Sequence, residues 1–220
     1  MADLLSVNLG VPRSSPATRV GVTGIDKRPA EGPVLVRAPG PKGTGLGSGV
    51  AGDRILDGGH HGGDDQAVYA YAREDLDAWA AELGRELPGG VFGENLTTHG
   101  LDVTGALVGE RWRVGGEVVL EVSVPRIPCN TFAHWMAEQG WVRRFTERAA
   151  PGAYLRVVRT GEIRAGDPIE VVQRPGHDVT IGLAFRALTR EPELLPRLLA
   201  ADALPEEALA KARRRVAAAG

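Results

Sequence analysis

The stretch RWRVGGEVVLEVSVPRIPC (residues 111–129) carries the clearest structural pattern of the chain. Its second half alternates apolar and polar residues, which predicts a strand with one buried and one solvated face. The residues expected to face inward are Leu120, Val122 and Val124, and those expected to face outward are Glu121 and Ser123. Gly115 and Gly116 predict a hairpin turn from a preceding strand. Hairpins of short strands are therefore expected to build the fold.

Short apolar runs recur on both sides of this hairpin, separated by turns rich in glycine and proline. The expected strands cover residues 6–10, 34–37, 67–71, 111–114, 118–124, 154–159 and 168–173. At least seven short strands with few helices predict a mainly β, barrel-like body. The segments 11–32 and 160–167 are expected to form turns. The glycine-rich segment 39–52 is expected to be a flexible surface loop, because it lacks the G-x-x-x-x-G-K-[ST] order of a phosphate-binding loop.

Helical periodicity is confined to a few segments of the barrel region. Residues 73–83 place Leu76, Trp79 and Leu83 on one apolar stripe, and Gly84 follows, so a helix that faces the core is expected. Residues 132–145 have a helical pattern that is interrupted by a glycine.

After residues 174–176 the sequence pattern changes from short strands to helices. Asp178 is expected to cap a helix over residues 179–188, and Pro192 and Pro205 each suit the first turn of another helix. Three short helices predict a small appended bundle. We therefore expect a β-barrel domain over residues 1–175 and a small helical C-terminal domain over residues 176–220.

The composition favours a soluble cytoplasmic protein. The net charge of −2 gives no reason to expect nucleic acid or an anionic membrane as a partner. No apolar run reaches the roughly 18 residues of a membrane-spanning helix, and no signal peptide is visible. A single cysteine cannot form an internal disulfide and suits a reducing compartment.

Three groups of residues could carry chemistry. His60 and His61 lie in a glycine-rich run, but neighbours in an extended chain point in opposite directions, so a hydrogen-bonding role for His61 is favoured over a zinc site. Asn95 follows Gly93 at the start of an expected strand and, taken alone, belongs to a turn.

The third group is the proline-rich segment 125–129, which carries Arg126 and ends in Cys129. A nearby guanidinium, or the dipole of a following helix, would favour the thiolate form of this cysteine. A lone cysteine is as often a small buried hydrophobe. No histidine lies at a spacing that identifies a papain-like pair, and there is no C-x-x-C motif.

In this order, these groups resemble the MOSC family, named for the C-terminal domain of molybdenum cofactor sulfurases. The matching segments are GIDKRPAEGPV (24–34), HHGGDDQAVYAY (60–71), FGENLTTHGL (92–101), VGERWRVG (108–115), VSVPRIPC (122–129) and YLRVVRTGEIRAGDPIEVVQRP (154–175). Each motif alone is weak, but their joint order is specific. The nearest branch resembles the bacterial hydroxylaminopurine-resistance proteins, in which a three-helix domain follows the MOSC barrel.

The resemblance implies a barrel similar to that of pyruvate kinase and a molybdopterin-type molybdenum cofactor. It implies that Cys129 ligates molybdenum through its thiolate, a soft ligand. Lys27 matches a basic position near the cofactor phosphate, on what we expect to be an exposed loop. His61, Asn95 and Arg126 match positions that contact cofactor or substrate, and His61 is also a candidate proton donor. The family's HGGPDKAV reads HGGDDQAV in this chain, so Gln66 replaces a lysine that could bind an anion.

Related enzymes reduce N-hydroxylated bases and amidoximes with electrons from a separate protein. The leading hypothesis is therefore a detoxifying, molybdenum-dependent oxidoreductase of small N-hydroxylated compounds. Two alternatives remain: a sulfur-transfer protein with a persulfide on Cys129, and a non-catalytic module that holds the cofactor. The helical tail is expected to cover one side of the pocket, or to dock the electron donor or a second subunit of a homodimer.

Overall fold

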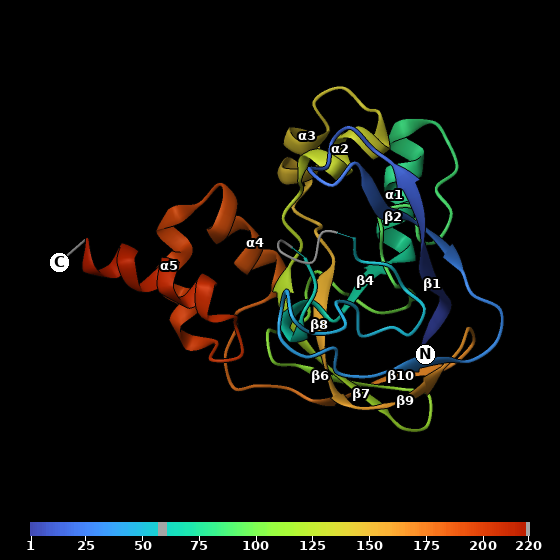
Figure 1. The fold of residues 1–220 in the computed structure, drawn as a ribbon. Coiled ribbons are helices and arrows are strands. Elements are labelled where there is room, and N and C mark those ends of the chain that lie inside the picture. Colours follow the sequence, from blue (N-terminus) through green and yellow to red (C-terminus); the bar gives the residue numbers. More distant parts are fainter. Residues whose placement is uncertain (57–60, 219–220) are drawn as a thin grey trace.

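The predicted hairpin lies in the wall of a closed β-barrel (Figure 1). The computed structural model describes residues 1–56 and 61–218. Seven strands follow the order β10-β6-β7-β8-β4-β5-β1, and pairing of β1 with β10 closes the barrel, while β2 pairs with residues 8–14 of β1. The strands of this sheet are β1 (Ala2–Ser14), β2 (Val22–Pro29), β4 (Val68–Ala72), β5 (Leu96–His99), β6 (Arg111–Val114), β7 (Val118–Pro125), β8 (Ala153–Arg159) and β10 (Pro168–Gln173). The mainly β barrel is thus confirmed.

The predicted alternation along β7 is correct for Leu120 and Val122 and wrong at its end. Ser123 is fully buried, whereas Val124 is only half-buried. The pairing of β7 with β8 shifts register between Val122 and Val124, which is the signature of a β-bulge. This irregularity turns Val124 and the following Pro125 toward the cavity described below.

Two segments that were expected to be turns contain strands. All of β2 lies within residues 11–32, and β9 (Gly161–Ile163) lies within residues 160–167 and pairs with β3 (Val34–Val36). Both segments are rich in turn-forming residues, but distant strands supply their hydrogen bonds. The glycine-rich segment 39–52 is also not wholly a surface loop, because Ser48 and Val50 are buried.

Three helices cover one end of the barrel (Figure 1): α1 (Arg73–Leu83), α2 (Asn130–Met136) and α3 (Trp141–Arg148). The bounds of α1 agree with the prediction, and Leu76 and Trp79 on its stripe are buried. Gly140 separates α2 from α3, as the interrupted pattern predicted. A second apolar core joins these helices to the barrel, with aromatic rings in edge-to-face contact; it includes Trp79, Phe92, Phe132, Trp141, Phe145 and Phe185.

The chain ends in α4 (Ile181–Thr189), the 3₁₀ segment η2 (Pro192–Ala200) and α5 (Glu206–Ala217), which project from one side of the barrel (Figure 1). The cap predicted for α4 was wrong. Thr180 caps the helix, and its hydroxyl accepts a hydrogen bond from the backbone N–H of Leu183 at 3.0 Å. Asp178 instead pairs with Arg197 at 2.5 Å.

The division at residues 175/176 stays a prediction. Phe185 of α4 packs against Phe145 in the aromatic core, and the backbone N–H of Ile181 donates to the carbonyl oxygen of Ala106. The first appended helix thus shares apolar contacts with the barrel. Among the described residues, no helix is both long and apolar enough to cross a membrane.

Candidate functional site

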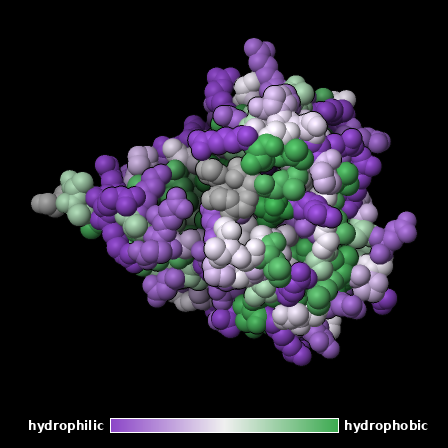
Figure 2. Space-filling model, viewed as in Figure 1, coloured by the Kyte–Doolittle hydropathy of each residue, from purple (hydrophilic) through white to green (hydrophobic). Residues whose placement is uncertain are grey.

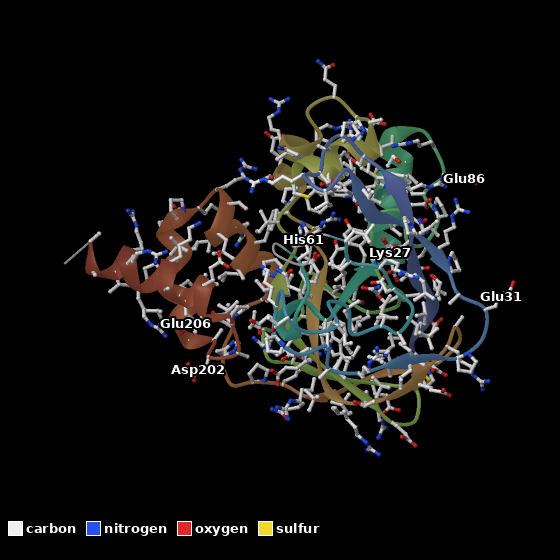
Figure 3. The ribbon with its side chains drawn as sticks, viewed as in Figure 1. Lys27, Glu31, His61, Glu86, Asp202 and Glu206 are labelled. Atoms are coloured by element: carbon white, nitrogen blue, oxygen red, sulfur yellow. The ribbon has the colours of Figure 1, made fainter. Side chains whose placement is uncertain are left out.

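A cavity of about 1050 Å³ lies between the barrel and the appended helices. All five residues singled out in the sequence line it: Lys27, His61, Asn95, Arg126 and Cys129. The appended helices contribute Leu188, Pro205, Glu206, Glu207, Ala208 and Lys211 to the opposite side. Figure 3 shows Lys27 and His61 in the barrel and Glu206 on the appended helices, whose visible surface is mostly hydrophilic in Figure 2.

Cys129 stands immediately before α2 in an extended conformation, with φ −127° and ψ 171°. Its side chain is half-buried and borders the cavity. The preceding segment runs on from the bulged end of β7, and its two prolines restrict the backbone of residues 125–129. The sequence prediction that a strand end presents the thiol to a pocket agrees with this placement.

Arg126 is buried beside the thiol and is held by aromatic rings. Its guanidinium lies 3.7 Å from the ring centre of Phe132 and 5.3 Å from that of Tyr69, and it donates a hydrogen bond to the carbonyl oxygen of Phe92. Burial alone would lower the pKa of Arg126, but the neighbouring Tyr69, Tyr154 and Cys129 raise it. A permanent positive charge therefore borders this part of the cavity.

Lys27 is not on an exposed loop, so that expectation was wrong. It lies on β2, its side chain is 8 % exposed, and its Nζ lies 2.5 Å from the carboxylate of Asp53, which is 1 % exposed. Asp53 also accepts hydrogen bonds from Gly10 N–H at 2.7 Å, Ser48 Oγ at 2.8 Å and Asn95 Nδ2 at 2.9 Å. Burial would raise the pKa of Asp53, but Lys27, Asn95 and Ser48 outweigh it and hold the pKa below its ordinary value.

This buried pair depends on a close approach of backbone at Gly10. A Cβ atom at Gly10 would lie 2.9 Å from Oδ1 of Asp53 and 2.7 Å from the carbonyl oxygen of Gly24. Since Gly10 is paired with Lys27 across β1 and β2, the missing side chain leaves room for the Asp53 carboxylate beside the lysine. The pairing of distant strands, rather than local sequence, thus buries Lys27.

Asn95 borders the cavity, but its amide also holds the fold. Its Oδ1 accepts from the backbone N–H of Tyr69 at 3.1 Å, and its Nδ2 donates to the carbonyl oxygen of Asn8 at 3.2 Å and to Asp53. Both N–H donors of the amide are therefore used within the protein. The structural role that the isolated motif suggested is present, and a contact with cofactor stays a prediction.

His61 is exposed and borders the cavity, whereas His60 lies outside the described residues. The acidic residues and the glutamine that follow fix the surrounding loops. Asp64 accepts from Gly40 N–H at 2.9 Å, Asp65 pairs with Arg156 at 2.6 Å, and Gln66 accepts from Gly62 N–H at 3.3 Å. Gln66, at the family's lysine position, thus bonds to backbone in this chain.

The sequence did not single out four residues that the structure brings to the cavity: Lys42, Asp53, Arg54 and Tyr154. Lys42 and Arg54 are exposed, and neither pairs with a carboxylate among the described residues. Lys42 lies in the glycine-rich segment 39–52, and Arg54 directly follows Asp53 in the chain. Neither residue belongs to a periodic sequence pattern that would indicate its position. Only the folding of residues 41–56 against the barrel reveals their position.

The comparisons with known proteins agree with this architecture. The family model described as MOSC domain matches residues 57–170, more than half of the 220-residue chain. The uncharacterized protein YflK of Bacillus subtilis is 31% identical over 208 residues, which cover 93% of this chain and 90% of YflK. A protein named reductase from Gibberella moniliformis is 33% identical over 157 residues, which cover 69% of this chain but only 26% of the reductase.

The crystal structure of YiiM from Geobacillus stearothermophilus is similar over the barrel and the appended helices. Its TM-score is 0.77 at 25% identity, and the match covers 98% of this chain and all of that one. The fold, the order of the motifs and the family model therefore all lead to one assignment: this chain belongs to the MOSC domain family.

Proposed function

We propose that this protein binds a molybdenum cofactor in the cavity, with Cys129 as a metal ligand, and that it reduces small N-hydroxylated compounds there. MOSC domains are generally linked to the molybdenum cofactor. The observation that carries the proposal is the position of Cys129, the only thiol of the chain, at a large cavity between two parts of the fold.

The residues around the cavity fit such a cofactor. The volume of about 1050 Å³ is at the upper end of the range for small-molecule sites, which suits a pterin together with a substrate. The thiol is the soft donor of the set. Since Lys27 is occupied by Asp53, we assign the binding of the cofactor's phosphate to Arg54 and Lys42 instead.

Removing the oxygen of an N-hydroxyl group as water takes two electrons and two protons. When bound, the cofactor supplies the two-electron redox chemistry. The protein's own residues surround the reactants: Arg126 provides a fixed positive charge, the first turn of α5 lines one side of the cavity, and His61 is a candidate proton donor.

The electrons come from a separate donor protein, because the sequence carries no flavin or iron–sulfur signature. The Gibberella relative is named a reductase and is about four times longer than its match to this chain, which covers 26% of its length. The name of this relative supports a reductive reaction for the proposed site. A cytoplasmic location and detoxification complete the proposal.

Molybdenum and pterin analysis of the purified full-length protein tests the proposal, together with turnover of an amidoxime by an artificial electron donor. We expect about one molybdenum and one pterin per chain and measurable reduction. Cofactor without turnover would favour the non-catalytic module. Protein free of cofactor that carries a persulfide on Cys129 would favour sulfur transfer.

The assignment of the phosphate contact makes a separate prediction. Replacing Arg54 and Lys42 together by glutamine is expected to weaken cofactor binding by roughly 1.5–3 kcal/mol, the scale of hydrogen bonds to charged groups. The measurement is the molybdenum and pterin content after dialysis. The matched control is Arg143→Gln, which removes an exposed charge from α3 outside the cavity. Equal loss in this control would show that net charge, rather than the cavity residues, retains the cofactor.

A further inference from the structure

The chain has three tyrosines, and their hydroxyl groups differ in whether they donate a hydrogen bond to the protein. Tyr69 donates to the carbonyl oxygen of Pro151 at 2.7 Å, and Tyr71 donates to that of Ala150 at 2.9 Å. The Tyr154 hydroxyl makes no hydrogen bond to any residue within 1–56 and 61–218. It is also not completely buried, unlike the inaccessible polar atoms that lack a partner. Since its side chain lines the cavity, this hydroxyl is open to a ligand.

Tyr154 lines the same cavity as Cys129, so a substrate bound near the cysteine would lie beside it. It faces Val124 across the bulged end of β7, five residues before the cysteine. Its side chain lines the cavity together with those of Arg126, Cys129 and Asp53. Its ring packs on Tyr69 with 5.0 Å between ring centres, so its orientation is fixed by a buried neighbour.

We propose that the Tyr154 hydroxyl is a substrate-binding group, which donates a hydrogen bond to the oxygen of the N-hydroxyl group. This inference rests on the proposed function and assigns the orientation of the substrate to a residue of this chain. A hydroxyl in a cavity without a protein partner is satisfied by water. A substrate oxygen that replaces this water keeps the hydrogen bond. The site thereby favours ligands that carry an N–O oxygen at this position.

The chemistry of the phenol group suits a donor role. A tyrosine hydroxyl has an ordinary pKa near 10, so it keeps its proton at neutral pH and can donate it in a hydrogen bond. Tyr69 and Phe132 pack against the guanidinium of Arg126, and Tyr69 also borders the cavity beside Tyr154.

The first test observes the tyrosines directly. The full-length, cofactor-loaded protein is labelled with ¹³C at the tyrosine Cζ atoms, and benzamidoxime is added without an electron donor, so that no turnover occurs. Three signals are expected, and Tyr→Phe substitutions assign them. We expect benzamidoxime to shift the Tyr154 signal and to leave that of Tyr71, which does not line the cavity, unchanged. A Tyr154 signal that does not move while the ligand binds would overturn the proposal.

The second test uses Tyr154→Phe, with Tyr71→Phe as the matched control that also loses one phenolic hydroxyl. We expect Tyr154→Phe to raise the KM for benzamidoxime roughly 2- to 10-fold, the effect of one hydrogen bond. Tyr71→Phe should keep the KM and lower only the stability. Equal KM values in wild type and Tyr154→Phe would overturn this inference alone, whereas a wild-type protein without any turnover would overturn the proposed function.

Discussion

Replacing Cys129 by serine is expected to lower the reduction of N-hydroxylated substrates by more than about a hundredfold while the fold stays intact. Loss of a residue that only supports a metal ligand typically costs 10–100-fold, so loss of the ligand itself should cost more. A serine hydroxyl matches the shape of the thiol but stays protonated at neutral pH and is a poor ligand for a soft site. Because the side chain is half-buried, stability should change little.

The measurements are turnover, molybdenum content and the thermal midpoint of unfolding. The matched control is Thr131→Ala, which alters a cavity residue two positions later without removing a metal ligand. We expect the control to keep its molybdenum. If Cys129→Ser retained both cofactor and activity, the thiol would not be a metal ligand, and the reductase proposal would have to place the metal elsewhere.

Replacing Asp53 by alanine is expected to lower the free energy of unfolding by about 3–5 kcal/mol, because it leaves Lys27 buried without its partner. Ser48 and Asn95 would each lose an acceptor as well. The measurement is urea denaturation at neutral pH. The matched control is Glu170→Ala on β10, which breaks an exposed ion pair with Arg113 and should cost no more than about 1 kcal/mol. Similar losses in the two variants would show that the Lys27–Asp53 pair is solvated.

The same pair predicts how stability depends on pH. Since the pKa of Asp53 is held below its ordinary value of 3.8, the carboxylate stabilises the fold above that value. This contribution is lost as the pH falls through the lowered pKa of the folded state. In Asp53→Asn, the free energy of unfolding should therefore fall less between neutral and acidic pH than it does in the wild type. Urea denaturation of both proteins at the two pH values measures this difference.

The parts of the fold that the sequence predicted correctly are those with a local, repeating pattern. The β6–β7 hairpin has two glycines between apolar runs, and α1 has an apolar stripe that ends at Gly84. In both, the buried face depends on residues a few positions apart, so a short window of sequence contains the information. The order of the family motifs likewise predicted the barrel and its cavity-lining cysteine.

The errors lie where distant segments meet. The bulge that buries Ser123 arises from the pairing of β7 with β8, and the strand β9 exists because β3 lies beside it. Thr180 rather than Asp178 caps α4, and Asp178 pairs with Arg197 of the following segment. In each case a partner far along the chain decides between two locally acceptable conformations.

By itself, the sequence determined the barrel class, the position of most strands and the candidate residues Cys129, His61, Asn95, Arg126 and Lys27. Only the tertiary structure decided what these side chains contact. The pairing of β1 with β2 places Lys27 beside Asp53, while its contact with a cofactor phosphate stays a prediction. Packing beside the appended helices completes the cavity and leaves the Tyr154 hydroxyl facing it. Charge pairing and exposure depend on distances between segments far apart in the chain, and local patterns in the sequence do not contain those distances.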